Sequence, residues 1–185
     1  TPPSADEPIP GMPAFPARIT ASGSWLCVPT ETGDVVALEA ATGQQHWRRT
    51  IRADRKLRTH GLAAWGDVIL IGAENLTDLP SRDRALLAWQ VATGQDAWSY
   101  PTMGDCLSIP LVAQDMAYFA SSEPRLYALD PRTRQLRWSA AALTWSPEPP
   151  AISGGIIIAP SRGPVVAAYA LETGERVWTF EAEDK

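Results

Sequence analysis

The sequence has few of the residues that metal and redox chemistry requires. Its 185 residues include only two cysteines and two histidines. His46 and His60 have no partner at the CxxC or HxxxH spacing of a metal site. The sequence also has no Gly-rich phosphate loop and no nucleophile elbow, and nothing pairs its carboxylates as acid and base. We therefore predict no catalytic, cofactor-binding or metal-ligating residues, and no enzymatic activity.

Long hydrophobic runs and helical periodicity are also missing. No run approaches the roughly 18 apolar residues that a membrane span needs, and no segment keeps a helical period over about ten residues. The first 15 residues are rich in proline, begin without methionine and lack the features of a signal peptide. We expect residues 1–15 to be an extended linker and the chain to be a piece of a longer polypeptide.

An eleven-residue motif occurs four times in the chain. Each copy has alanine first, threonine sixth, glycine seventh and tryptophan last, except that Arg134 replaces the glycine of the third copy. The tryptophans recur at a period near 40 residues, which indicates one supersecondary unit per repeat. The motif residues are Ala37, Gly43 and Trp47, then Ala88, Gly94 and Trp98, then Ala128 and Trp138, then Ala168, Gly174 and Trp178.

Short apolar segments rich in β-branched and aromatic residues precede each motif, as expected for β-strands. Two such strands, a third entering the motif and a fourth carrying its tryptophan make a four-stranded antiparallel unit. The Thr-Gly turn joins the last two strands, because glycine takes a positive φ without steric cost. The sequence therefore predicts an all-β propeller, with blades at 16–51, 59–101, 107–141 and 148–182. An open meander or a solenoid is the alternative.

The frame Ala-x-Asp-x-x-Thr-Gly-x-x-x-Trp resembles the tryptophan-docking repeat of the quinoprotein, or PQQ-like, propeller family. The resemblance covers residues 16–182. It implies that each tryptophan packs between the alanine of its own motif and the peptide at the glycine of a neighbouring motif. These tryptophans are then structural, and Arg134 should modify one of the four contacts.

The resemblance also implies the functional alternatives. We expect a non-catalytic module that binds a protein or ligand, within a larger bacterial protein. Relatives of this kind favour an extracytoplasmic location, periplasmic or on the cell surface. One alternative is a sensor domain of a receptor or Ser/Thr protein kinase. Another is a fragment of a PQQ-dependent dehydrogenase, but the chain lacks the adjacent cysteine pair of many such enzymes, and we therefore expect no cofactor.

Four blades of this family should fill about half of a ring, which would expose two apolar blade faces. Two copies related by a two-fold axis could close an eight-bladed ring. A true four-bladed ring and a partner that supplies additional blades are the alternatives. Cys27 and Cys106 fall at non-equivalent positions of different blades, so we expect buried free thiols rather than a disulfide.

Charge is concentrated in one connection. The net charge is −5, yet residues 48–58 carry six basic groups and one acidic group. This segment joins the first two blades, and a long insert at 74–84 interrupts the second. Loops longer than their counterparts are common binding sites, although a solvated loop with mutual salt bridges is the simpler interpretation. Nucleic acid is not expected as a partner. The candidate surface consists of Arg52, Arg55, Lys56, Arg58, His60, Glu74, Asn75, Asp78, Arg82 and Arg84.

Overall fold

The computed structural model describes residues 18–30, 32–51, 57–59, 61–72, 74–75, 85–106, 108–143, 146, 148–159 and 164–182. All regular structure in these ranges is β-strand. A helix that is long and apolar enough to span a membrane is not found among them.

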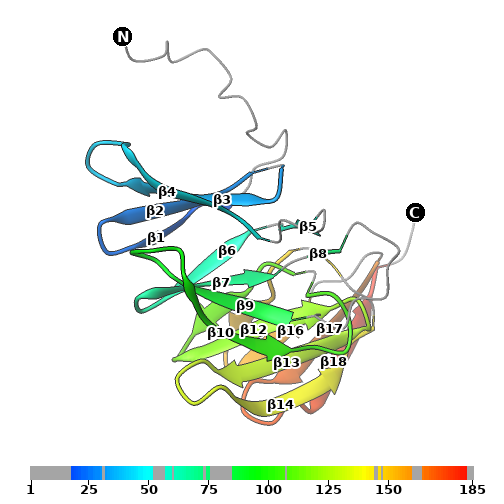
Figure 1. The fold of residues 1–185 in the computed structure, drawn as a ribbon. Helices are drawn as coiled ribbons and strands as arrows, with labels where there is room; N and C mark the ends of the chain where they lie inside the picture. The colour runs from blue at the N-terminus through cyan, green and yellow to red at the C-terminus, as the bar shows by residue number, and fades with distance from the viewer. Residues whose placement is uncertain are drawn as a thin grey trace.

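Sixteen of the strands form four antiparallel sheets of four, and each sheet follows the chain up and down (Figure 1). These sheets are the blades of the predicted propeller. Blade one contains β1 (Thr20–Ser22), β2 (Trp25–Pro29), β3 (Asp34–Glu39) and β4 (Gln45–Thr50). Blade two contains β6 (Leu62–Trp65), β7 (Val68–Gly72), β9 (Ala85–Gln90) and β10 (Asp96–Pro101). Blade three contains β11 (Leu111–Ala113), β12 (Met116–Ser121), β13 (Arg125–Asp130) and β14 (Gln135–Ala141). Blade four contains β15 (Ala151–Ser153), β16 (Ile156–Ala159), β17 (Val165–Ala170) and β18 (Arg176–Glu181).

The repeated motif forms the hairpin between the last two strands of every blade. Its first and last residues face each other across the hairpin, as in the Ala37–Trp47 and Ala128–Trp138 pairs. A register shift next to each pair places one extra residue on the tryptophan strand, which is a β-bulge and bends that strand. The same local geometry is therefore built four times from the same residues.

Arg134 adopts a left-handed backbone with φ of 62°, close to the 71° of Gly43 in the first copy. The prediction of a positive φ at this turn is therefore confirmed. Asp130 supports the turn, because its Oδ1 accepts hydrogen bonds from the backbone N–H groups of Arg132 and Thr133 at 2.8 and 3.1 Å. Burial alone would raise the pKa of Asp130, but these hydrogen bonds outweigh it and lower the pKa. This aspartate stabilises a turn that glycine would form without strain.

We expect Arg134→Gly to raise the melting temperature. The left-handed conformation costs a residue with a Cβ about 1–2 kcal/mol, and the greater freedom of glycine in the unfolded chain offsets only part of this. The Arg134 side chain is exposed, so its removal uncovers no core. Thermal denaturation of the two proteins measures the change. A lower melting temperature would show that the arginine makes a stabilising contact.

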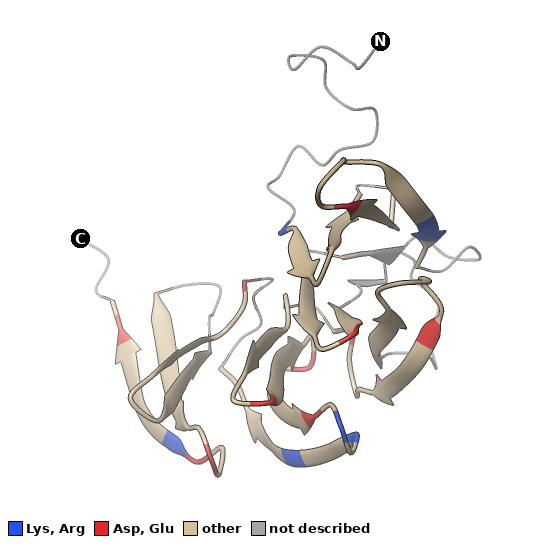
Figure 2. Cartoon of the chain, turned by 90° about the vertical axis from the view of Figure 1, so that its left-hand side faces the viewer, with Lys and Arg blue, Asp and Glu red and all other residues tan. Residues whose placement is uncertain are grey.

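The blades lie side by side in an arc from the N-terminal to the C-terminal blade (Figure 2). Three core clusters fill the spaces between consecutive blades: one between blades one and two, one between two and three, and one between three and four. None of these clusters joins blade four to blade one, so the described blades do not close a four-bladed ring through a shared core. An exposed ion pair links the segments ahead of these two blades, with Arg18 and Glu148 3.7 Å apart.

Both cysteines lie in these clusters as free thiols, and this confirms the prediction. Burial raises the pKa of Cys27 to about 11, and burial together with the negative charge of Asp105 raises that of Cys106 further. The thiols are therefore held in the neutral, unreactive form.

Candidate protein-binding surfaces

A two-stranded ribbon lies outside the four blades. Its strands are β5 (Leu57–Arg58), from the connection between blades one and two, and β8 (Glu74–Asn75), from the insert of blade two. Arg58 pairs with Glu74, and Leu57 pairs with Asn75. The ribbon lies at the end of the blades opposite the Thr-Gly hairpin of blade one (Figure 1). The end of the basic connection and the start of the insert therefore meet at one end of the propeller.

Only part of the predicted surface lies among the described residues. The backbones of Arg58, Glu74 and Asn75 form the ribbon. The others lie outside the described ranges, namely Arg52, Arg55, Lys56, His60, Asp78, Arg82 and Arg84. The role of this surface in binding stays a prediction.

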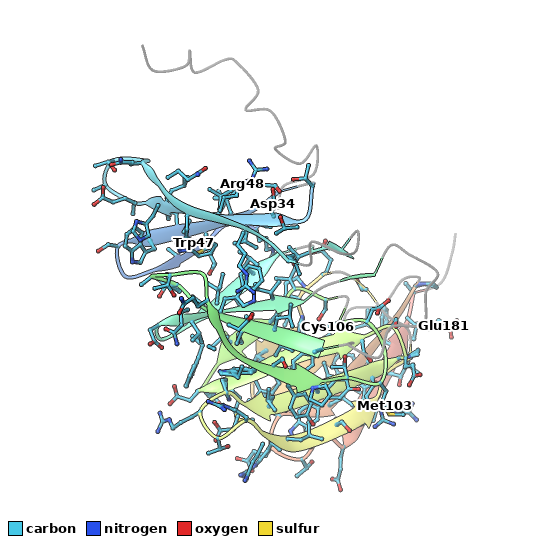
Figure 3. The ribbon with its side chains drawn as sticks, in the orientation of Figure 1. Asp34, Trp47, Arg48, Met103, Cys106 and Glu181 are labelled. Carbon is cyan, nitrogen blue, oxygen red and sulfur yellow. The ribbon has the colours of Figure 1, made fainter. Side chains whose placement is uncertain are left out.

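Asp34 anchors the strand that leads into the basic connection. Its carboxylate accepts hydrogen bonds from Thr50 Oγ1 at 2.6 Å and from Arg48 Nε at 2.7 Å (Figure 3). Asp34 is 8% exposed. Its burial alone would raise the pKa of the carboxyl group, but the hydrogen bonds from Thr50 and Arg48 and the charge of Arg48 lower it overall. These hydrogen bonds of Asp34 hold the end of β4 beside the start of β3.

We expect Asp34→Asn to lower the free energy of unfolding at pH 7 by about 1–3 kcal/mol, because the amide cannot replace the charged acceptor. A lowered folded-state pKa stabilises the protein above the unfolded-state value of about 3.9. This contribution is lost as the pH falls through the folded-state pKa. Urea denaturation at several pH values should show the difference between the two proteins shrinking below about pH 4. A difference that is constant with pH would contradict the electrostatic explanation.

Arg49 looked from sequence like part of a free basic cluster, but it ties blade one to blade two. Its guanidinium donates to the carbonyl of Gly94, pairs with Asp96 at 3.0 Å and lies 4.1 Å from the ring centroid of Trp89. Two hollows of about 380 Å³ each flank this side chain. Since its donors and its cationic face are engaged within the seam, we interpret the hollows as features of blade packing. Arg48 is similarly engaged by Asp34, so two of the six basic groups have structural partners.

Tryptophans of the motif contact the next blade. The indole N–H of Trp47 donates to the carbonyl of Val91 at 2.8 Å, and that of Trp138 donates to the carbonyl of Leu171 at 2.9 Å. Each acceptor lies three residues before the motif glycine of the next blade. A Cβ added to Gly94 would lie 2.9 Å from Cδ2 of Trp47. The indole is therefore seated directly on the glycine, at the seam between blades one and two where Figure 3 labels Trp47.

The other two copies differ. For Trp98 the equivalent acceptor is the carbonyl of Pro131, and the described contacts include no hydrogen bond between them. Here the next motif carries Arg134, whose Cβ stands where the other blades have a bare glycine. Trp178 is in the last blade, and its side chain is 39% exposed compared with 8% for Trp138. Trp138, which packs against blade four, is thus more buried than Trp178.

Within the described ranges, no three His, Cys, Asp or Glu side chains gather as metal ligands. The thiols of Cys27 and Cys106 are both free and buried in different core clusters, unlike an adjacent pair beside a cofactor.

A family model described as outer membrane protein assembly factor BamB, of the PQQ-like repeat type, matches residues 11–100 and 31–185. The chain belongs to this PQQ-like propeller family. The curated protein named outer membrane protein assembly factor BamB from Yersinia pestis is 24% identical over 170 residues, which cover 84% of this chain and 41% of that protein. The chain thus spans less than half the length of this relative.

Solved structures show the same fold. BamB from Moraxella catarrhalis is 19% identical with a TM-score of 0.53, and the match covers 89% of this chain and 64% of that one. A europium-containing methanol dehydrogenase is 12% identical with a TM-score of 0.72, covering 89% and 41%. The computationally designed Ika8 protein is 13% identical with a TM-score of 0.68, covering 89% and 48%. At these identities the similarity concerns the propeller alone.

Proposed function

We propose that this chain is a non-catalytic propeller module that binds protein partners, within a larger extracytoplasmic bacterial protein. The observation that carries the proposal is the match of its four blades to the family of an outer membrane assembly factor. By analogy, the partner is a component of a protein assembly machinery at the cell envelope. The open ring is completed by further blades, from a second copy or from the parent protein.

We place the contact surface on the end of the propeller that carries the β5–β8 ribbon. The ribbon supports this choice because it brings the basic connection and the insert together at one site. Its two strands are additions to the repeated four-stranded blade and belong to none of the four sheets. Residues that only build the propeller, such as the motif tryptophans, have equivalents in all four blades, whereas the ribbon has none among the described strands.

A photoreactive amino acid at Asn75, in the parent protein expressed in its own bacterium, tests this surface. We expect cross-linking to a defined envelope protein from Asn75, and none from the control position Gln44 in the hairpin at the opposite end of blade one. Equal labelling from both positions, or labelling from neither, would contradict the proposal.

Titration with pyrroloquinoline quinone and Ca²⁺ tests the enzyme alternative, and we expect no uptake of the quinone chromophore.

A further inference from the structure

Two exposed apolar side chains hold the same position in neighbouring blades. Met103 and Leu143 each follow the motif tryptophan of their blade by five residues, and they are 63% and 37% exposed. Each begins the connection to the next blade, at the end opposite the Thr-Gly hairpin. This end also carries the β5–β8 ribbon, and Figure 3 labels Met103 there. Both side chains lie between described blades, so additional blades at either end of the arc would not cover them.

The turn at 122–124, which joins β12 to β13, holds the loop of Met103 in place. The backbone N–H of Ser122 donates to the carbonyl of Asp105 at 2.8 Å. In return, the hydroxyl of Ser122 accepts a hydrogen bond from the N–H of Asp105 at 3.0 Å. A Cβ added to Gly104 would lie 2.5 Å from Oγ of Ser122, so the loop packs tightly on the turn. Met103 is therefore presented by a backbone that is already fixed.

The other side of the same turn holds Leu143. The backbone N–H of its neighbour Ala142 donates to the carbonyl of Pro124 at 2.8 Å. Met103 and Leu143 therefore flank one turn, and the middle residue of that turn is Glu123. Glu123 is exposed, and its carboxylate takes part in none of the ion pairs between described residues. The result is a negative charge between two exposed apolar side chains.

We propose that Met103, Glu123 and Leu143 form an anchor site for a segment of a protein partner that carries a lysine or arginine between two apolar side chains. This inference rests on the proposed function, since it names the chemistry of the segment that the ribbon end binds. Apolar side chains on a fixed backbone lose little conformational freedom on binding. The exposed carboxylate selects a positive charge in the partner and disfavours an acidic one.

Selection of random peptides displayed on phage, with the 185-residue chain as bait, tests the anchor site. We expect the enriched peptides to share a basic residue flanked by apolar ones. A synthetic peptide of that consensus should bind Met103→Ser or Leu143→Ser about tenfold more weakly, the loss typical of an interface residue that contributes to affinity. Enrichment of peptides without this pattern, or of no peptides, would overturn the proposal.

Leu136→Ser is the matched control. Leu136 is 40% exposed, close to the 37% of Leu143. It lies on the same strand, β14, but next to the hairpin at the opposite end of blade three. Its replacement should leave the dissociation constant of the peptide unchanged, and circular dichroism confirms that each variant is folded. Equal losses from the two leucine variants would mean that the peptide does not distinguish the anchor site, and the proposal would be wrong.

Reversing the charge of the turn gives the sharpest result. Glu123→Lys should weaken binding of the consensus peptide about tenfold and should favour the same peptide with glutamate in place of its basic residue. An unchanged preference would show that Glu123 does not select the charge.

Cross-linking from Asn75 reports on the proposed function separately. A partner labelled from Asn75, together with peptides that ignore the three substitutions, would reject the anchor site alone. Peptides that bind as expected, with no partner labelled from Asn75, would reject the proposed envelope partner and support the anchor site.

Discussion

Replacing Trp138 with alanine will lower the free energy of unfolding by about 3–5 kcal/mol, the range for large-to-small changes of buried aromatic residues. The indole is 8% exposed, donates a hydrogen bond to the Leu171 carbonyl and rests on Gly174. Its loss opens a cavity between blades three and four. Urea denaturation of the variant and the original protein measures the change.

Trp178→Ala is the matched control for this substitution, because the two tryptophans hold the same position in neighbouring blades. Trp178 is 39% exposed and has no following blade in the chain described. Its replacement in the 185-residue chain should therefore cost far less than that of Trp138. Equal destabilisation by the two changes would show that contact with the next blade is not what makes the motif tryptophans stabilising.

Gly174→Ala will also be strongly destabilising, by about 2–5 kcal/mol. The φ of 73° costs an alanine about 1–2 kcal/mol. In addition, the new Cβ would lie 2.5 Å from Cε3 of Trp138, and overpacking of this kind costs about 1–3 kcal/mol. The expected cost is therefore larger than strain alone can give, and denaturation by urea measures it.

Gly154→Ala separates the two contributions within the same blade. Gly154 has a φ of 55°, and an added Cβ would meet nothing within 4 Å. Its replacement should cost only the strain of about 1–2 kcal/mol. If the two variants are equally stable, the indole moves aside at little cost, and the seat on Gly174 is less specific than its geometry indicates.

The motif predicted the blades well because it is a local pattern. The spacing of Ala128 and Trp138 fixes a hairpin in which the two residues pair, and the structure contains that pair. The same pattern predicted the left-handed turn at Arg134, where a side chain replaces the usual glycine. Both features depend on residues within about ten positions of one another. The hairpin and its turn can therefore be predicted from the sequence alone.

The contacts between blades were harder to predict. Arg49 counted as one charge of a basic cluster, although it is bound by Gly94, Asp96 and Trp89 about 45 residues away. One sequence signal pointed to this. Arg49 lies two residues after a motif tryptophan, on the strand that faces the next blade. This position predicts a contact only if one knows which blade lies beside the strand, and the repeat alone does not give that arrangement. The pairing of β5 with β8 was not predicted, because strands of two residues leave no periodic pattern in the sequence.

The placement of tryptophan and glycine on the same hairpin has an evolutionary consequence. Blades one, two and four carry both the glycine on which the tryptophan of the blade behind would rest and a tryptophan for the blade ahead, while blade three has Arg134 in place of the glycine. A duplicated gene segment of about 40 codons therefore brings its own attachment to both neighbours, and no compensating mutation is needed at either seam. Loss of a segment is equally simple. Families built in this way can change their number of blades by single recombination events. The curvature of the ring, rather than the contacts between blades, then limits which numbers of blades are retained.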